Sequence, residues 1–211
     1  MAKIIRLEPS KHIPGRYLVF LEGAAEPLLR VTEEEILRFA LHRGQILEDE
    51  TLEELTRSAG LSNARATAAR MVGARPLSKG ELVRRLRQKG IRPEWADAAA
   101  DWLEDIGAID EQAYADMLAR HYAAKGYGVR RIQDEFFKRR VPRDCWSQAL
   151  EQLEGPEDAI DRLIEKKLRG GTPDRRELQR VSAFLARRGF HWEEIRAGLN
   201  RYGARIEEED P

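Results

Sequence analysis

Residues 130–153 read RRIQDEFFKRRVPRDCWSQALEQL, and related segments occur on both sides of this stretch. The first is GELVRRLRQKGIRPEWADAAADWL at residues 80–103, and the last is RELQRVSAFLARRGFHWEEIRAGLN at residues 176–200. The segments align at offsets of 50 and 49 residues, and the matched positions are apolar: Leu82, Ile132 and Val181, and then Leu86, Phe136 and Leu185. Matched apolar positions with variable surface positions are typical of repeated units that each bury the same face.

The ends of the helices can be predicted from local signals. Ser78 followed three residues later by Glu81 is a capping-box pattern, and Gly90 can supply the left-handed residue that ends the helix. The third copy has Gly189 at the position of Gly90, but the second copy has Arg140. Because left-handed geometry costs a residue with a side chain about 1–2 kcal/mol, we expect the helix before Arg140 to end differently.

The first 60 residues do not share this period. The runs RYLVFLEG at 16–23 and EPLLRV at 26–31 are typical of short strands, so a small β-hairpin or three-stranded unit is predicted. Two capping boxes follow, Thr32 with Glu35 and Thr51 with Glu54, and they predict two helices. A further helix, SNARATAARMV at 62–72, then opens the first repeat.

The predicted fold is therefore mainly α, with three tandem three-helix repeats forming an elongated curved array behind a small N-terminal β/α unit. The soft boundary between the two parts is expected near residues 60–62. The predicted domains are 1–60 for the N-terminal unit, 61–107, 108–155 and 156–204 for the repeats, and 205–211 for an acidic tail.

The composition argues against several classes of protein. No apolar run approaches the roughly 20 residues needed to cross a bilayer, and the start of the chain does not resemble a secretory signal, so we expect a cytoplasmic protein. The four histidines are scattered, and no phosphate-binding loop, dinucleotide signature or zinc pattern is present. The single cysteine, Cys145, lies beside Trp146 in a predicted helix, which favours a buried, unreactive thiol. We therefore expect no enzyme, no metal and no cofactor.

The charge is unevenly placed, although the chain has 37 basic and 37 acidic residues. Residues 78–92, 128–143 and 173–190, around the middle helix of each repeat, hold five or six basic side chains against one or two acidic ones, whereas the third helices are acidic. Stacked units would align these helices into a basic ridge beside an acidic one. The candidate partner-binding residues are Arg84, Arg85, Lys89, Arg130, Arg131, Lys138, Arg139, Arg187 and Arg188.

Two interpretations of this charge remain open. The basic residues can be ordinary solvated helix faces that complement the helix dipole near C-termini. Alternatively, they can face an anionic partner, either nucleic-acid phosphates or an acidic groove in another protein. Phe137 is similarly ambiguous, because it is either an exposed interface anchor among arginines or a second core residue beside Phe136.

Four segments resemble the RecX family of bacterial regulatory proteins. They are VTEEEILRFALHRGQILEDETLEEL (31–55), RPLSKGELVRRLRQKGI (75–91), LEDIGAIDEQAYADMLARHYAAKGYGVRRIQDEFFKRRV (103–141) and LARRGFHWEEIRAGL (185–199). The most specific stretch is IGAIDEQAYA at 106–115, which resembles the family pattern of an apolar residue, Asp, Asp or Glu, two variable residues, an aromatic residue and Ala. Gly128, Ile132 and Phe136 then resemble its glycine, isoleucine and leucine framework.

The resemblance implies a monomeric modulator that lies in the helical groove of the RecA recombinase filament and lowers recombinase, ATPase and co-protease activity, in DNA repair, homologous recombination and the SOS response. The main alternative is a non-specific DNA-binding protein that acts through its basic middle helices, since RQKGIRPEW at 87–95 superficially resembles a helix-turn-helix. Against it, the helix that would enter the major groove carries Glu94, Asp97 and Asp101, which phosphates repel. Weak DNA binding is compatible with both interpretations.

Overall fold

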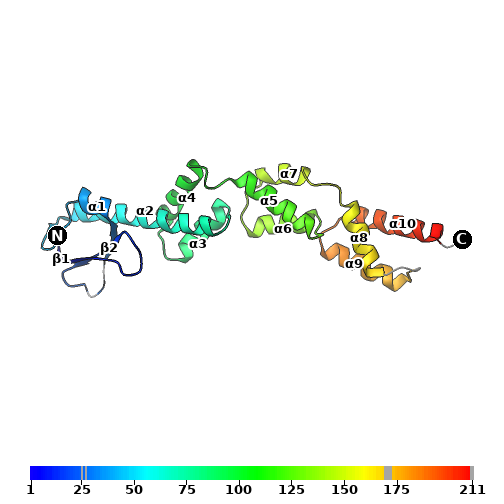
Figure 1. The fold of residues 1–211 in the computed structure, drawn as a ribbon, viewed down its shortest axis with the longest axis horizontal. Coiled ribbons are helices and arrows are strands. Elements are labelled where there is room, and N and C mark those ends of the chain that lie inside the picture. Colours follow the sequence, from blue (N-terminus) through cyan, green and yellow to red (C-terminus); the bar gives the residue numbers. More distant parts are fainter. Residues whose placement is uncertain (25, 27, 169–172, 210–211) are drawn as a thin grey trace. The chain divides into compact units, whose positions relative to one another are not determined.

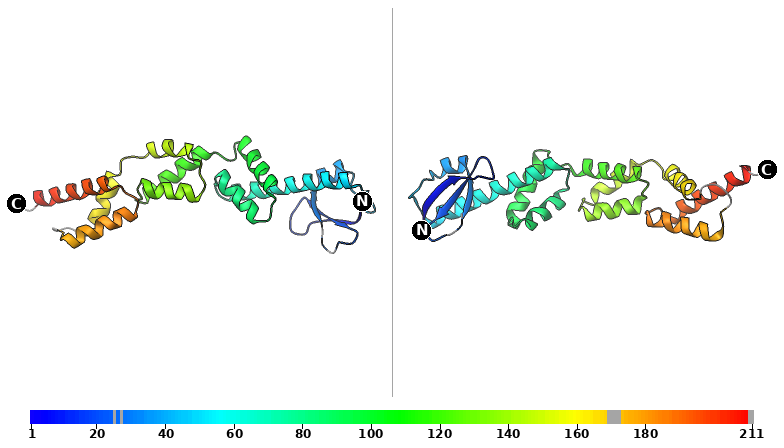
Figure 2. Two further views of the ribbon diagram at one scale, coloured as in Figure 1. Left: turned by 180° about the vertical axis from the view of Figure 1, so that it is seen from behind. Right: turned by 60° about the horizontal axis from the view of Figure 1, so that its bottom comes forward.

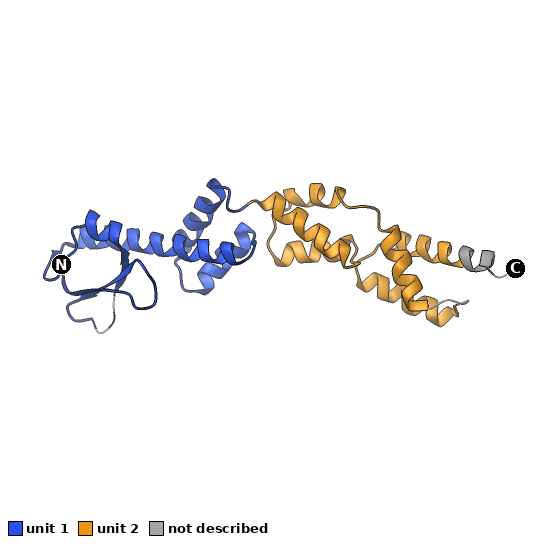
Figure 3. Cartoon of the chain, in the orientation of Figure 1, with its two compact units in different colours: residues 1–109 blue, residues 110–211 orange. Residues whose placement is uncertain are grey.

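The computed structural model describes residues 1–24, 26, 28–168 and 173–209. It divides into two compact units, residues 1–109 and 110–211 (Figure 3). The described residues form ten helices and four short strands, so the predicted mainly α fold with an N-terminal β unit is confirmed.

The first unit opens with an antiparallel sheet near the N-terminus (Figure 2), and its strand order is β3-β2-β1-β4. Its strands are β1 (Ala2–Pro9), β2 (Arg16–Leu21), β3 (Leu29–Thr32) and β4 (Ile46–Leu47). β1 was not anticipated from the sequence. One face of the sheet buries Ile4, Val19 and Val31, which pack with Leu55 of helix α2. The sheet therefore depends on that helix for its core.

Helix α1 (Glu33–Arg38) begins at the predicted capping box, in which Thr32 and Glu35 each accept a hydrogen bond from the other's backbone amide. The second predicted box is wrong. Helix α2 (Asp49–Ala74) begins two residues before Thr51, because Asp49 and Glu50 in its first turn complement the helix dipole. Glu54 pairs instead with Arg38 of α1, at 2.6 Å between carboxylate and guanidinium.

Helix α2 continues without interruption through residues 60–62, so the two helices expected on either side of this point are one (Figure 1). Gly60 allows close packing here and does not act as a linker. A Cβ atom on Gly60 would lie 2.4 Å from the indole ring of Trp95 in helix α4 (Pro93–Asp105). The single helix thus contributes to the core under the sheet and to the core shared with α3 (Lys79–Gln88) and α4.

The second unit contains two groups of three helices (Figure 1). The first group comprises α5 (Glu111–Ala124), α6 (Val129–Lys138) and α7 (Asp144–Glu151). The second comprises α8 (Glu157–Leu168), α9 (Arg175–Arg187) and α10 (Trp192–Glu209). All six matched apolar positions of the repeat are buried, with at most 4% of any of them exposed: Leu82, Ile132, Val181, Leu86, Phe136 and Leu185.

The expectation that α6 would end unusually at Arg140 is wrong. Arg140 is left-handed, with φ of +56°, and Val141 donates its amide to the Phe136 carbonyl at 3.0 Å. The same bond joins Ile91 to Leu86 after α3. The strain at Arg140 is tolerated because this turn places Val141 in the core, where it is 5% exposed.

Cys145 is buried as expected, and burial together with the carboxylate of Asp144 raises the pKa of its thiol, which keeps it protonated and unreactive. Among the described helices, none has both the length and the apolar character required to span a bilayer.

Candidate partner-binding surfaces

The second and third repeats are joined by direct backbone contact between the start of α6 and the end of α9. The Gly128 amide donates to the Arg188 carbonyl at 2.9 Å, and the Arg130 amide donates to the Gly189 carbonyl at 3.1 Å. A Cβ atom on Gly128 would lie 2.5 Å from the carbonyl carbon of Gly189, and one on Gly189 would lie 2.3 Å from the Arg131 amide. The contact therefore requires glycine on both sides.

Arg188 reinforces this junction. Its Nη1 atom donates to the carbonyl oxygens of Lys125 at 2.8 Å and Gly126 at 2.9 Å, which close helix α5. Its guanidinium also lies 4.9 Å from the ring centroid of Tyr127 and 5.0 Å from that of Phe184. Arg188 was predicted to bind a partner, but its side chain is committed to holding the two repeats together.

Beside the junction, α6 and α9 border a groove of about 450 Å³. Its lining residues are Arg130, Arg131, Gln133, Asp134, Ala186, Arg187 and Gly189. Arg130 and Arg187 are exposed, and neither has an ion-pair partner among the residues that the structure describes. The groove therefore brings three predicted partner-binding residues, Arg130, Arg131 and Arg187, from two repeats to one place, with a net positive charge.

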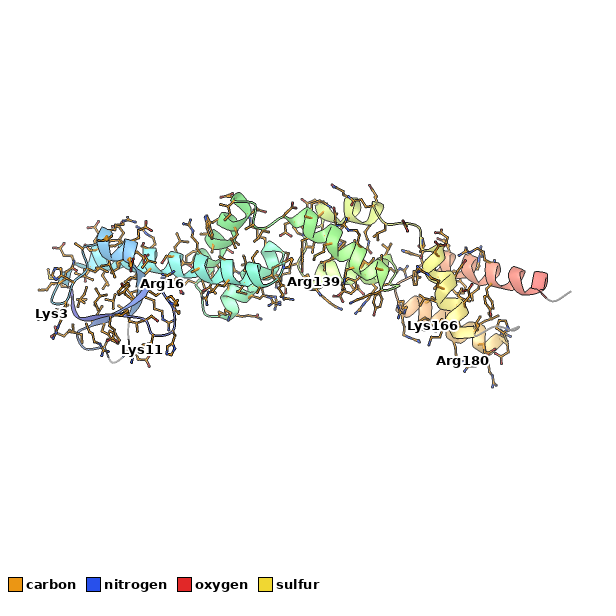
Figure 4. The ribbon with its side chains drawn as sticks, viewed as in Figure 1. Lys3, Lys11, Arg16, Arg139, Lys166 and Arg180 are labelled. Atoms are coloured by element: carbon orange, nitrogen blue, oxygen red, sulfur yellow. The ribbon has the colours of Figure 1, made fainter. Side chains whose placement is uncertain are left out.

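Three of the predicted residues, Arg131 among them, surround a buried carboxylate in α6. Glu135 has a side chain only 10% exposed and lies 3.2 Å from Arg131, 3.2 Å from Lys138 and 3.6 Å from Arg139, which Figure 4 labels. The hydroxyl of Tyr122 donates to it at 3.0 Å. Burial alone would raise the pKa of Glu135, but the hydrogen bonds from Tyr122 and Lys138 and the nearby positive charges outweigh burial and lower it.

Helix α3 of the first repeat shows a similar arrangement. The buried carboxylate is Glu81, which accepts hydrogen bonds from Arg85 at 2.6 Å and from Arg75 at 3.0 Å. In addition, two basic residues of this repeat pair with acids on α4: Lys79 with Asp101 and Glu104, and Arg87 with Asp97. Here the acidic third helix neutralises much of the basic middle helix.

The nine predicted residues therefore fall into distinct groups. Hydrogen bonds or ion pairs within the chain engage Arg85, Arg131, Lys138, Arg139 and Arg188. Arg84 lies 4.0 Å from the carboxylate of Glu81 and 3.5 Å from the amide oxygen of Gln88. At these distances both interactions are weak. Lys89, Arg130 and Arg187 are exposed and lack ion-pair partners within the described part of the chain. That any of the nine contacts a partner stays a prediction.

The sequence left the exposure of Phe137 open and did not predict a groove in the first unit. Phe137 is 69% exposed, so of its two interpretations the exposed side chain is correct. The first unit also contains an unanticipated groove of about 590 Å³ between α1, α2 and α4, in which Arg65 lies 5.4 Å from the ring of Trp102. At its edge Arg16 of β2 (labelled in Figure 4) donates to the hydroxyl and carbonyl of Ser62, fixing the sheet to α2.

These features define a helical-repeat protein with a positively charged groove between two of its repeats, and the described residues form no cluster of metal ligands. Comparison with known proteins is consistent with this class. Residues 110–150 match the model of the second RecX three-helix domain, and residues 156–199 match that of the third.

Regulatory protein RecX of Pseudomonas savastanoi pv. phaseolicola is 35% identical over 128 residues, which are 60% of this chain and 83% of that protein. The RecX protein of Geobacillus thermodenitrificans is 28% identical over the whole chain and 81% of its own length. The chain belongs to the RecX family of regulatory proteins, which are not enzymes.

Two solved structures show the same fold. A crystal structure of a regulatory protein RecX has a TM-score of 0.69 at 21% identity and covers 95% of this chain and all of the other. RecX from Lactobacillus salivarius has a TM-score of 0.61 at 17% identity, over 67% of this chain and 96% of its own.

Proposed function

We propose that this protein binds the filament formed by the RecA recombinase on single-stranded DNA, in the filament's helical groove, and lowers its recombinase, ATPase and co-protease activities. The family assignment supports a regulatory role. The observation that carries the proposal further is the groove between α6 and α9, where Arg130 and Arg187 remain available in a chain whose formal net charge is zero. A surface of this kind favours an anionic partner, and a nucleoprotein filament presents both phosphates and acidic side chains.

Several weak contacts suffice for such binding. The three repeats each carry basic residues, and a filament presents the same protomer surface many times. Once one repeat is bound, the others meet the filament at a high effective concentration, so modest individual contacts add to a large overall affinity. The proposal therefore does not need one deep pocket.

The test is the ATPase activity of RecA on single-stranded DNA, titrated with this protein. We expect the wild type to inhibit, and R130A/R187A to require at least about tenfold more protein for the same inhibition, a loss that corresponds to about 1.4 kcal/mol. The matched control is R175A/R176A, which removes two exposed arginines from the other end of α9 and should inhibit like the wild type. ATPase activity that is unchanged by the wild type would refute the proposal.

The basic residues around Glu135 are unsuitable for this test. Their removal would leave a buried carboxylate without its cations, so lost inhibition would report unfolding. Binding to bare single-stranded DNA should be measured for the same variants. If inhibition decreases in proportion to DNA affinity across all of them, the protein acts by binding DNA alone.

A further inference from the structure

Helix α6 carries a large apolar side chain on its outer face. Phe137 is 69% exposed, whereas the adjacent Phe136 is fully buried. Single exposed apolar residues are common on protein surfaces, so the exposure of Phe137 by itself indicates nothing. Its surroundings decide whether it belongs to a binding surface.

Phe137 lies on the same face of α6 as the groove described above. Residues at spacings of three, four and seven share a helix face, which places Phe137 with Asp134, Gln133 and Arg130. These three residues line the groove, and Arg187 lines it from α9. Phe137 thus stands one helical turn beyond the groove, at the end that leads to the exposed, left-handed Arg140.

The matching position differs in the other two repeats. In the first repeat it is Arg87, which pairs with Asp97 of α4 at 2.9 Å. In the third repeat it is Ala186, which lines the groove opposite α6. The residue that matches Asp97 in the second repeat is Ser147, so the sequence replaces an ion pair inside the repeat with an exposed ring.

We propose that Phe137 and the groove between α6 and α9 form one docking surface for an acidic protein segment that offers an apolar pocket to the ring. The surface combines three exposed cations that have no ion-pair partner among the described residues, Arg130, Arg140 and Arg187, with one acid, Asp134. Aromatic residues, phenylalanine included, and arginine are enriched in the buried cores of protein interfaces. This inference rests on the proposed function and assigns the surface to the protein component of the filament.

Two observations favour a protein over a nucleic acid as the partner of this surface. The carboxylate of Asp134 lies between Arg130 and Phe137 on one face, where it would repel a phosphate backbone that follows that face. In addition, the ring is flanked on its own helix by Gln133, a neutral side chain suited to hydrogen bonding with backbone or amide groups. A protein segment can place acids against Arg130 and Arg187 and a hydrogen-bond donor against Asp134, which a uniformly charged phosphate backbone cannot.

A photo-crosslinking experiment tests the assignment directly. Phe137 is replaced by p-benzoyl-phenylalanine in the full chain, and the protein is irradiated with RecA filaments on labelled single-stranded DNA. We expect an adduct with the recombinase protein. The control places the same probe at Leu37 on α1, which is 81% exposed and outside the surface.

The other outcomes are distinguishable. An adduct with the DNA, an adduct with a second copy of this chain, or no adduct while the chain still inhibits the ATPase would each overturn the inference and leave the proposed function standing. A wild-type chain that fails to inhibit overturns the proposed function itself.

Affinity measurements supply a second readout. We expect F137A to weaken filament binding about tenfold and F137L to weaken it less, while L37A binds like the wild type. The loss from F137A should persist at high salt because it is apolar, whereas the loss from R130A/R187A should shrink. Thermal unfolding should be unchanged for F137A, since the ring is mostly exposed. Wild-type affinity for F137A would overturn the inference.

Discussion

The middle helices of the first and second repeats each pair a buried carboxylate with an arginine four residues away, but the order of acid and base along the helix is reversed. In α3 the acid comes first, with Glu81 pairing with Arg85, whereas the two matching positions in α6 carry Arg131 and Glu135. Each helix therefore has a buried carboxylate with cations gathered around it, although the carboxylate has moved by one helical turn. A local excess of basic residues can therefore serve the fold, and it overstates the charge that is available to a partner.

The two arrangements are not equally favoured by the helix itself. An acid that precedes a base by four residues agrees with the helix dipole, as in α3, and the reverse order in α6 does not. Three cations surround each carboxylate, but Glu135 also accepts a hydrogen bond from the hydroxyl of Tyr122. The stability that the buried carboxylate provides should consequently depend on more side chains in α6 than in α3.

The largest expected effect comes from removing the cations of α6. R131A/K138A/R139A leaves Glu135 buried without a positive charge, and we expect a loss of about 3 kcal/mol in the free energy of unfolding. Denaturant-induced unfolding measures it. R130A/R187A serves as the control and should change stability by less than about 0.5 kcal/mol.

The matching variant of the first repeat sharpens the comparison. R75A/R85A removes the closest cations of Glu81 and should be similarly destabilising. If the α6 variant were as stable as the wild type, the equivalence of the two carboxylates would be broken.

A smaller effect is expected at the junction that the second and third repeats share. R188A removes two hydrogen bonds from a charged group to the carbonyls of Lys125 and Gly126, which we expect to cost about 2 kcal/mol. R188K keeps the charge but loses the planar stacking on Tyr127 and Phe184, so it should restore only part of the loss. Hydrogen exchange of the α9 amides would report the change. Unaltered exchange in R188A would show that Arg188 does not hold the two repeats together.

The pH dependence of stability tests the pairing of Glu135 with its cations. The pKa of Glu135 is lowered in the folded protein, so the stabilisation that it provides is present above its ordinary value of 4.5 and is lost as the pH falls through the lower folded value. We expect E135Q to be less stable than the wild type at neutral pH and to show a shallower decline in acid. Parallel unfolding curves for the two proteins between pH 6 and about pH 3 would contradict this sign.

The sequence predicted the core of the repeats well and the destinations of the charges poorly. Ile132 and Phe136 were assigned to the core because burial of apolar groups is set by a period that the sequence displays directly. The role of Arg188 could not be found in this way, since it depends on which carbonyls of a distant helix end lie within reach. The pair Arg131 and Glu135, by contrast, stands at a spacing of four residues, and that signal was present in the sequence.

Gly60 and Arg140 show why local rules also fail at particular places. A glycine in a helical pattern suggested a boundary, but packing against Trp95 required its missing side chain inside a continuous helix. Arg140 breaks the glycine rule at a helix end because the tertiary contact of Val141 outweighs a local strain of about 1–2 kcal/mol.

The smallest effect is expected from a substitution that makes the second repeat resemble the other two at this turn. R140G relieves the left-handed strain but gives the unfolded chain more freedom, so we expect a net gain of about 0.5–1 kcal/mol in stability. The reciprocal change in the first repeat, G90R, should lose a similar amount, because Gly90 has φ of +80° in the same kind of turn. Thermal unfolding of both variants gives the comparison. If R140G gained stability but lost affinity for the filament, the strained arginine would be retained for binding and not for the fold.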